Sequence, residues 1–460
     1  MLDIVLILLA AGAVFVVAQR SGFPKGTCVA IALLVSLSPD LDIATAVTVH
    51  RVILAVLVLL WLQGPRGAPV RGRLPFFSIL IVILCAHVGS LLISVTPSEL
   101  AVPEPRGSSL KDCIAFVVEI LLFYRVVGST LTTPTAGLAA LRALVYGLAG
   151  VAVVALIERY FRIILPVILF SHFRYLLDGI QSTYPHRILL GYAMAMGMPV
   201  ALSLLDLAPS KKQKWWMWVV VFLTAAACFL ADSRGGWIGM AIGGAISFLF
   251  GTAQTRKRCL WVIVLALATL IFKPGVRDTI LDRYTETLDK GSYKETSYSY
   301  RWKLWHVAFS ETNKSPERFL FGYGGQSTQG MDLSRYFGHE EGGTAVKIGF
   351  TSWDNHYAAD LMEFGWVGLG LEIILYASIL LGLLRRWLDA KEAVKGVLGG
   401  LIAVCVIYFF AKSNVYIFSV QLNFVFWTVV VVGCVAFRTQ AARARLPVRR
   451  RVAEPVSVTQ

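Results

Sequence analysis

This sequence is short of charge. Asp, Glu, Lys and Arg make up 15% of its 460 residues, whereas a soluble domain carries about 25%. Hydrophobic residues make up 57%, and they gather in apolar runs that recur from one end of the chain to the other. A large soluble helical protein would need a buried place for every one of these runs. The composition therefore predicts an all-α polytopic membrane protein.

The sequence also has no cysteine framework and no motif for a cofactor. The seven cysteines lie in apolar runs or at their edges without CxxC spacing, which argues against disulfides and zinc. The glycine-rich stretch FLFGYGGQSTQG, 319–330, lacks the Lys-Ser/Thr ending of a phosphate-binding loop. We interpret it as a turn that lets the backbone approach a site. We expect neither a metal nor any other cofactor.

Basic residues are present in excess, and their distribution is uneven. The formal net charge is +15. The stretches 63–74, 208–214 and 252–258 each hold three Lys or Arg and no acidic residue. The stretches 385–395 and 438–460 are also basic. Alternating spans put these five stretches on one side, which is the positive-inside pattern of cytoplasmic loops. The basic excess therefore indicates topology and not a nucleic-acid partner.

Apolar segments of the chain give the number of crossings. Segment 26–39 is short, because a membrane span needs about 20 residues. We therefore expect about 12 transmembrane helices, with 13 as the alternative, and prefer 12 with both ends in the cytoplasm. The candidate spans are 2–19, 26–39, 45–62, 75–95, 110–128, 140–157, 188–207, 215–231, 236–251, 259–272, 357–384, 396–412 and 418–437.

The loops divide the chain into five parts. N-terminal spans with short outer segments occupy 1–187, and central spans occupy 188–272. The segment 273–356 has eleven basic and eleven acidic residues, which predicts a folded, partly helical loop on the outer side. C-terminal spans follow over 357–437, and the basic cytoplasmic tail is 438–460.

Ionisable side chains at the edge of a span are a first guide to function, because they are costly at membrane depth. In FLADSRGGWIGM, 229–240, Asp232 and Arg234 lie in a short turn between two spans. Gly235 and Gly236 permit a tight backbone there. Arginine offers a planar fork of donors that suits phosphate oxygens. The alternative is an Asp232–Arg234 ion pair that only closes the hairpin.

A second candidate region is SYSYRWKLWHVAFS, 297–310. Trp302, Trp305 and Phe309 recur there at helical spacing. This predicts an amphipathic helix on the outer leaflet with its aromatic rings at headgroup level. Arg301 in this helix is a second candidate phosphate ligand, and the alternative is simple anchoring. Arg187, at the end of the outer segment before span 188–207, is a further candidate.

In a third region, SWDNHYAADLMEFGWVG, a polar cluster directly precedes an apolar helical pattern. Ser352, Asp354 or Asn355 can cap the helix that becomes span 357–384.

His356, Asp360 and Glu363 follow at spacings of four and seven residues from the histidine, so they share one face of that helix. A carboxylate one turn from an imidazole orients the ring and raises its basicity. The alternative is a solvated first turn before the membrane begins.

Together these motifs resemble the O-antigen ligase and polymerase superfamily of bacterial envelope glycosyltransferases. The resemblance rests on DSRGGW, on YRWKLWHVA in the outer loop, and on the FGYG turn. It also rests on the dipeptide Asp354-Asn355, followed by nine residues and a GxxG that begins at Gly365. In this order the motifs cover about 188–384.

The resemblance implies a GT-C-like fold and a metal-independent reaction. Such enzymes move a glycan from an undecaprenyl diphosphate carrier to a sugar hydroxyl at the periplasmic face of the bacterial inner membrane. The acceptor is lipid A–core for the ligases of lipopolysaccharide biosynthesis. It is a growing O-antigen or exopolysaccharide glycan for the polymerases, for which a chain-length regulator is a further partner.

The resemblance also implies roles for single residues. Arg234, Arg301 and Arg187 would bind the diphosphate. Ligases carry histidine where this chain has Asp354, and the nearest histidine is His356. Either His356 or Asp354 is then the general base for the acceptor hydroxyl, and the departure favours a polymerase slightly. The residues that would support the site are Asp232, Asn355, Asp360 and Glu363.

A transporter or flippase of a lipid-linked sugar is the alternative function. Transporters place ionisable residues near the bilayer midplane in broken helices, often in two related halves. Here Glu119, Arg125 and Lys412 are the few charges that we assign to spans or their edges, and no internal repeat is visible. The chemistry gathers at the outer face, which favours an enzyme over a transporter or an inactive scaffold.

Overall fold

The structure is a computed structural model. It describes residues 2–38, 42–44, 47–64, 74–93, 106–169, 179–288, 293–325, 353–417 and 420–437, with isolated positions between 327 and 336. The tail 438–460 and much of 326–352 lie outside the described residues.

The N-terminal part is helical apart from one small hairpin. It contains α1 (Leu2–Ser21), α2 (Phe23–Ser36), β1 (Asp42–Ala44), β2 (Val47–Thr48), α3 (Val49–Leu62), α4 (Phe77–Ile93), α5 (Arg106–Thr130), α6 (Pro134–Phe161) and α7 (Leu165–Leu169).

The remainder of the described chain contains no further strand. Its helices are α8 (Arg187–Leu204), η1 (Leu205–Leu207), α9 (Lys211–Leu230), α10 (Arg234–Phe250), α11 (Ala253–Phe272), α12 (Pro274–Leu288), α13 (Tyr293–Thr312), α14 (Pro316–Phe321), α16 (His356–Asp389), α17 (Glu392–Asn414), α18 (Val420–Val431) and the π-helical turn η3 (Val432–Ala436).

The predicted helical membrane architecture is confirmed, because every predicted apolar segment overlaps with a helix. Within the described residues, six helices are long and apolar enough to cross a membrane. A seventh span is added if α11 and α12, which meet at a bend of 95°, count as one. Shorter apolar helices, among them α2 and α3, accompany them. The total of about 12 crossings stays a prediction.

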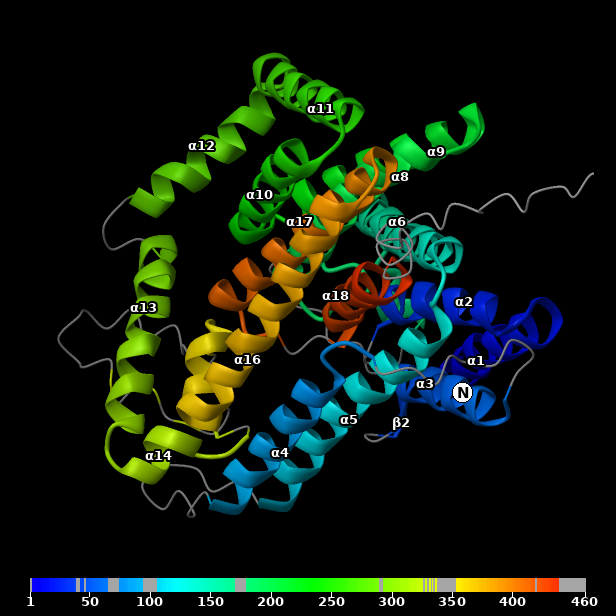
Figure 1. The fold of residues 1–460 in the computed structure, drawn as a ribbon. Helices are drawn as coiled ribbons and strands as arrows, with labels where there is room; N and C mark the ends of the chain where they lie inside the picture. Colours follow the sequence, from blue (N-terminus) through cyan, green and yellow to red (C-terminus); the bar gives the residue numbers. More distant parts are fainter. Residues whose placement is uncertain are drawn as a thin grey trace, which may run out of the picture.

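Helix α8 forms the centre of the bundle and packs against α10 and α17 (Figure 1). Glycines make this close packing geometrically feasible. A Cβ atom on Gly236 of α10 would lie 2.9 Å from the Cα atom of Gly191 in α8. A Cβ atom on Gly400 of α17 would lie 2.8 Å from the carbonyl oxygen of Pro199. Small residues allow such backbone approach, which is how membrane helices gain packing energy in lipid.

Some of the stretches predicted for opposite sides of the membrane lie at opposite ends of α8, α10 and α16. At one end, the starts of α8 and α10 meet through Arg187 and Asp232. At the other end, Asp206, which follows α8, bonds Thr252 before α11, and Trp387 near the end of α16 bonds the carbonyl of Phe250 at 2.7 Å. The first end carries the candidate site.

Helix α16 is broken at Gly365. This residue has φ 62° and ψ −167°, a backbone conformation that is essentially restricted to glycine. Gly322, which ends α14, has the same conformation, with φ 69° and ψ −156°. A Cβ atom on Gly322 would lie 2.7 Å from the nitrogen of Gly365. The two glycines therefore let two backbones touch.

Backbone hydrogen bonds join the FGYG turn to this break. The Tyr323 amide donates to the Met362 carbonyl at 2.9 Å, and the Gly324 amide donates to the Glu363 carbonyl at 2.8 Å. The hydroxyl of Thr328 donates to the Glu363 carboxylate. The predicted turn is thus part of the support of α16.

Helix α13 buries one side, and of its three predicted lipid-facing aromatic residues Trp305 packs against the buried residues of that side. Tyr300 and Leu304 are buried in a second core together with Ala358 and Met362 of α16. On the opposite face, Trp302 is 60% exposed. The helix therefore fixes one face to the start of α16, and its placement on the outer leaflet stays a prediction.

Candidate functional site

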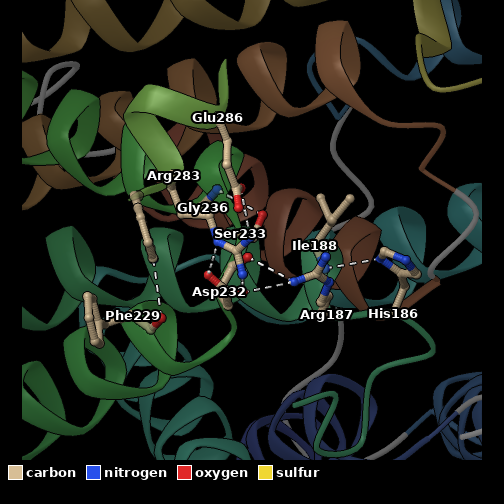
Figure 2. A network of polar contacts seen from close by, with 10 residues as sticks. His186, Arg187, Ile188, Phe229, Asp232, Ser233, Gly236, Arg283 and Glu286 are labelled. Carbon is tan, nitrogen blue, oxygen red and sulfur yellow. Dashed lines mark hydrogen bonds and ion pairs between the residues drawn. The ribbon is translucent and has the colours of Figure 1, made fainter. Parts of the chain in front are cut away.

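Two helices of the central bundle begin with an arginine. His186 caps α8, because its Nδ1 accepts a hydrogen bond from the Ile188 amide at 3.1 Å (Figure 2). Ser233 caps α10 by accepting from the Gly236 amide. Arg187 and Arg234 are consequently the first helical residues, where the helix dipole disfavours positive charge and favours an anion. An anion bound between them would be stabilised by both the side chains and the dipoles.

Asp232 lies in the turn between α9 and α10 and joins two arginines (Figure 2). Its backbone is left-handed, with φ 49°. Arg187 Nη1 donates to the Asp232 carbonyl at 3.0 Å and lies 3.3 Å from Oδ2. Arg283 donates to both carboxylate oxygens, with Nε 3.1 Å from Oδ1. The alternative of an Asp232–Arg234 pair is therefore wrong, since the carboxylate faces Arg187 and Arg283.

Arg283 is a residue that sequence reasoning missed. It lies on α12, which runs beside the bundle, and it also donates to Glu286 at 3.0 Å (Figure 2). Arg283 and Glu286 are spaced like an ordinary ion pair on a solvated helix, so the local sequence gives no sign of a site. Only the fold shows that α12 brings this guanidinium to the α9–α10 turn.

Arg234 and Arg301 complete the cluster. The charge of Arg234 interacts with those of Arg301, Arg283 and Arg187, so the other three guanidinium groups lie within electrostatic reach of Arg234. Arg301 Nε donates to the Asn414 carbonyl at the end of α17 at 2.8 Å. Its Nη2 lies 3.2 Å from Asp354 Oδ2. We call Arg187, Arg234, Arg283 and Arg301 the arginine cluster.

The start of α16 carries the polar dipeptide of the third motif. Of the three predicted caps, Asn355 performs this role, because its Oδ1 accepts a hydrogen bond from the Ala358 amide at 3.2 Å. Asp354, just before the cap, points to Arg301 and has 24% of its side chain exposed. The structure thus joins Asp354 to the arginine cluster.

His356 has both ring nitrogens engaged. Nδ1 accepts a hydrogen bond from the Ile417 amide at 2.9 Å, so the proton of the neutral ring is on Nε2. Nε2 lies 3.5 Å from Asp360 Oδ1. The predicted contact between His356 and Asp360 is therefore present, and the lone pair of the imidazole is already used. Glu363 is separate from this pair, since its carboxylate accepts from Thr328.

Beneath His356, charged groups form a buried ion cluster. Lys412, with 2% of its side chain exposed, lies 3.1 Å from Asp360 Oδ2 and also contacts Glu372. Its Nζ is 3.3 Å from the hydroxyl of Tyr376. These residues line a cavity of about 80 Å³ between α4, α5, α16, α17 and α18, together with His87.

Sequence reasoning named His356, Asp360 and Lys412, but it missed Glu372. An ionisable residue inside an apolar run is a usable signal, and Glu372 lies in the middle of predicted span 357–384.

Glu311 of α13 binds two tyrosines that follow α14 in the chain. Its buried carboxylate accepts hydrogen bonds from the hydroxyls of Tyr323 at 2.8 Å and Tyr336 at 2.5 Å. Lys314 lies 2.8 Å away. Burial raises the pKa of Glu311, but these three partners together hold that pKa below its ordinary value.

No group of three or more His, Cys, Asp or Glu side chains in the described ranges lies in a metal-binding arrangement. The fold and the site therefore define a helical membrane protein with a candidate anion-binding site, built from arginines, at one end of its bundle.

A comparison with known protein families gives a match over part of the chain. Residues 219–373 match the family model described as O-antigen ligase. The match includes Asp232, Arg234, Arg283, Arg301 and Asp354, so the part of the chain that holds most of the site carries a domain of this family. The resemblance predicted from the sequence is confirmed. A search of the curated proteins found no match.

Proposed function

We propose that the protein transfers a glycan from an undecaprenyl diphosphate carrier to a sugar hydroxyl at the periplasmic face of the bacterial inner membrane. One observation carries the proposal: the arginine cluster lies beside the carboxylate of Asp354, at one end of the helical bundle. The match to the O-antigen ligase family supports the same reaction class.

The arginine cluster suits the leaving group of this reaction. When the bond between the sugar C1 and the carrier oxygen breaks, negative charge develops on the diphosphate. Planar guanidinium groups donate paired hydrogen bonds to phosphate oxygens, and preorganised donors stabilise charge as it develops. Arg234 and Arg301 would bind the diphosphate together with Arg187. Arg187 and Arg234 lie at helix starts, and Arg301 of α13 is held by its bond to the Asn414 carbonyl at the end of α17.

Asp354 is our choice for the general base. The acceptor hydroxyl would give its proton to the Asp354 carboxylate while its oxygen forms the new bond to C1 and the carrier diphosphate departs. Asp354 faces Arg301, on the side where the diphosphate would bind. His356 is less suited, because its Nδ1 lone pair is bound to the Ile417 amide and its Nε2 faces Asp360. We assign His356 to holding α16 against the segment after α17.

Purified protein with a carrier-linked glycan tests this proposal. We expect Arg301→Ala and Asp354→Ala to abolish transfer, whereas His356→Gln retains measurable transfer if the fold persists. Growth of the glycan with the carrier-linked donor alone identifies a polymerase, which the Asp354-Asn355 dipeptide favours. Product only with lipid A–core identifies a ligase. Full activity of Asp354→Ala would refute its role as base.

Transport of a lipid-linked sugar is the second candidate function. The observation that favours it is the buried ion cluster of Lys412, Asp360 and Glu372 on a helix broken at Gly365. Charges near broken helices are common in transporters. Movement of carrier across proteoliposome membranes without glycan transfer would select this function, and transfer without movement would exclude it.

A further inference from the structure

We propose that Asp232 is an internal substitute for a phosphoryl group. Its carboxylate occupies an anion subsite formed by Arg187 and Arg283, and a diphosphate that enters the arginine cluster displaces it. The inference rests on the proposed function, because it assumes that the cluster binds a diphosphate. It adds Arg283 as a ligand of that diphosphate and gives Asp232 a competitive role.

The geometry of Asp232 is that of a bound anion. Arg283 donates hydrogen bonds to both carboxylate oxygens of Asp232, from Nε to Oδ1 at 3.1 Å and from Nη2 to Oδ2. Arg187 Nη1 approaches Oδ2 from another helix at 3.3 Å. A phosphoryl group offers the same paired oxygens to a guanidinium fork. The carboxylate is 28% exposed, so it is accessible to a competing anion.

Both arginines keep a partner when the carboxylate leaves. Arg187 Nη1 also donates to the backbone carbonyl of Asp232 at 3.0 Å, and this bond does not involve the side chain. Arg283 Nη1 also donates to Glu286 at 3.0 Å. The two guanidinium groups therefore stay in place while their shared anion is exchanged. This arrangement suits replacement of the carboxylate better than a fixed structural ion pair does.

We assign the two phosphoryl groups of a diphosphate to two subsites. Arg187 and Arg283 form the first, which Asp232 occupies. Arg301, with Asp354 as its partner, forms the second, and Arg234 interacts with the arginines of both. A monophosphate can fill one subsite only. We therefore expect the site to prefer diphosphate over monophosphate, and the preference to depend on Arg283.

Binding of inorganic diphosphate and orthophosphate to the purified full-length protein tests the inference at constant ionic strength. Asp232→Asn removes the competing charge and tolerates the left-handed backbone, which asparagine adopts readily. We expect this variant to bind diphosphate about tenfold more tightly, a change that corresponds to about 1.4 kcal/mol. Asp232→Gly, which also tolerates this backbone, should show the same direction. Arg283→Ala should bind diphosphate more weakly.

Two controls separate this effect from general electrostatics. Asp278→Asn makes the same charge change on α12, where Asp278 pairs with the exposed Arg277, and should leave the affinity unchanged. In the Arg283→Ala background, Asp232→Asn should tighten diphosphate binding much less than it does in the wild-type protein. Unchanged or weaker diphosphate binding in both Asp232→Asn and Asp232→Gly would overturn the inference while wild-type binding upholds the proposed function. No diphosphate binding by wild-type protein would overturn both.

Discussion

Gly365→Ala is the substitution that tests the architecture of the site most sharply. Gly365 breaks α16 between the segment that carries Asp354 and the rest of the helix, and its φ of 62° with ψ of −167° is essentially restricted to glycine. An added Cβ atom would lie 2.5 Å from the carbonyl carbon and oxygen of Leu320 and 2.6 Å from the nitrogen of Phe321. These are backbone atoms, so the whole FGYG turn must move.

The cost of this change has two parts. Forcing a non-glycine residue into this conformation costs about 1–3 kcal/mol. Moving the turn breaks the backbone hydrogen bonds of Tyr323 and Gly324 at 2.9 and 2.8 Å, each worth about 0.5–1.5 kcal/mol. We expect a destabilisation of about 2–6 kcal/mol in all. Gly322→Ala should behave in the same way, because its Cβ atom would meet Glu363 at 2.6 Å.

Gly370→Ala is the matched control, since it lies in the same helix and a Cβ atom there would have nothing within 4 Å. Alanine is favoured over glycine within helices by about 0.5–1 kcal/mol, so this variant should be as stable as wild type or more stable. Thermal unfolding of the purified proteins in one detergent compares the three. Equal unfolding temperatures for Gly365→Ala and Gly370→Ala would refute the proposed backbone contact.

Three further predictions concern charged groups. Lys412→Met leaves the buried Asp360 and the partly buried Glu372 without their cation, and should destabilise the protein by about 3–5 kcal/mol. In the same thermal assay, the Lys391→Met change at an exposed lysine should not. Glu311→Gln should lower stability near neutral pH, and this difference should shrink as pH falls below about 4.5, because the folded pKa of Glu311 is lowered and its stabilisation is lost on protonation. Arg301→Lys should reduce transfer strongly although the charge is kept, because lysine cannot address Asn414 and Asp354 with one planar fork.

A pH-independent difference between wild type and Glu311→Gln would contradict the assignment of the carboxylate as the stabilising form. A wild-type rate for Arg301→Lys would show that charge alone suffices at this position. Unaltered stability of Lys412→Met would mean that the buried ion cluster relaxes without its cation.

Much of the fold was predictable from the sequence because lipid imposes a simple rule. Every backbone group in the bilayer core must be bonded within its own segment, so long apolar runs become helices. The basic loops predict which ends of the helices share a side, and this topology stays a prediction, although the contact of Arg187 in α8 with Asp232 before α10 agrees with it. The number of crossings was harder to predict, because α2 and α3 are both shorter than a full span.

The candidate site was predictable in its motifs but not in its pairings. Asp232, Arg234, Arg301 and Asp354 are prominent because charge is rare at the edges of apolar runs. Their partners depend on long-range packing that no local pattern encodes. The pairing of Asp232 with Arg283 requires the bend between α11 and α12.

The choice of Asp354 over His356 as the general base likewise depends on a distant part of the chain. The amide of Ile417, 61 residues further along, occupies the ring nitrogen of His356. Sequence spacing alone could give the shared helix face of His356 and Asp360 but not this bond.

Release of undecaprenyl diphosphate from a carrier-linked glycan, measured with purified protein and acceptor, tests glycan transfer at the arginine cluster. We expect the wild-type protein to release the carrier one-to-one with glycan transfer, and Arg301→Ala to lose both at unchanged unfolding temperature. Undiminished coupled release and transfer by Arg301→Ala, or carrier movement across the membrane without any release, would contradict it.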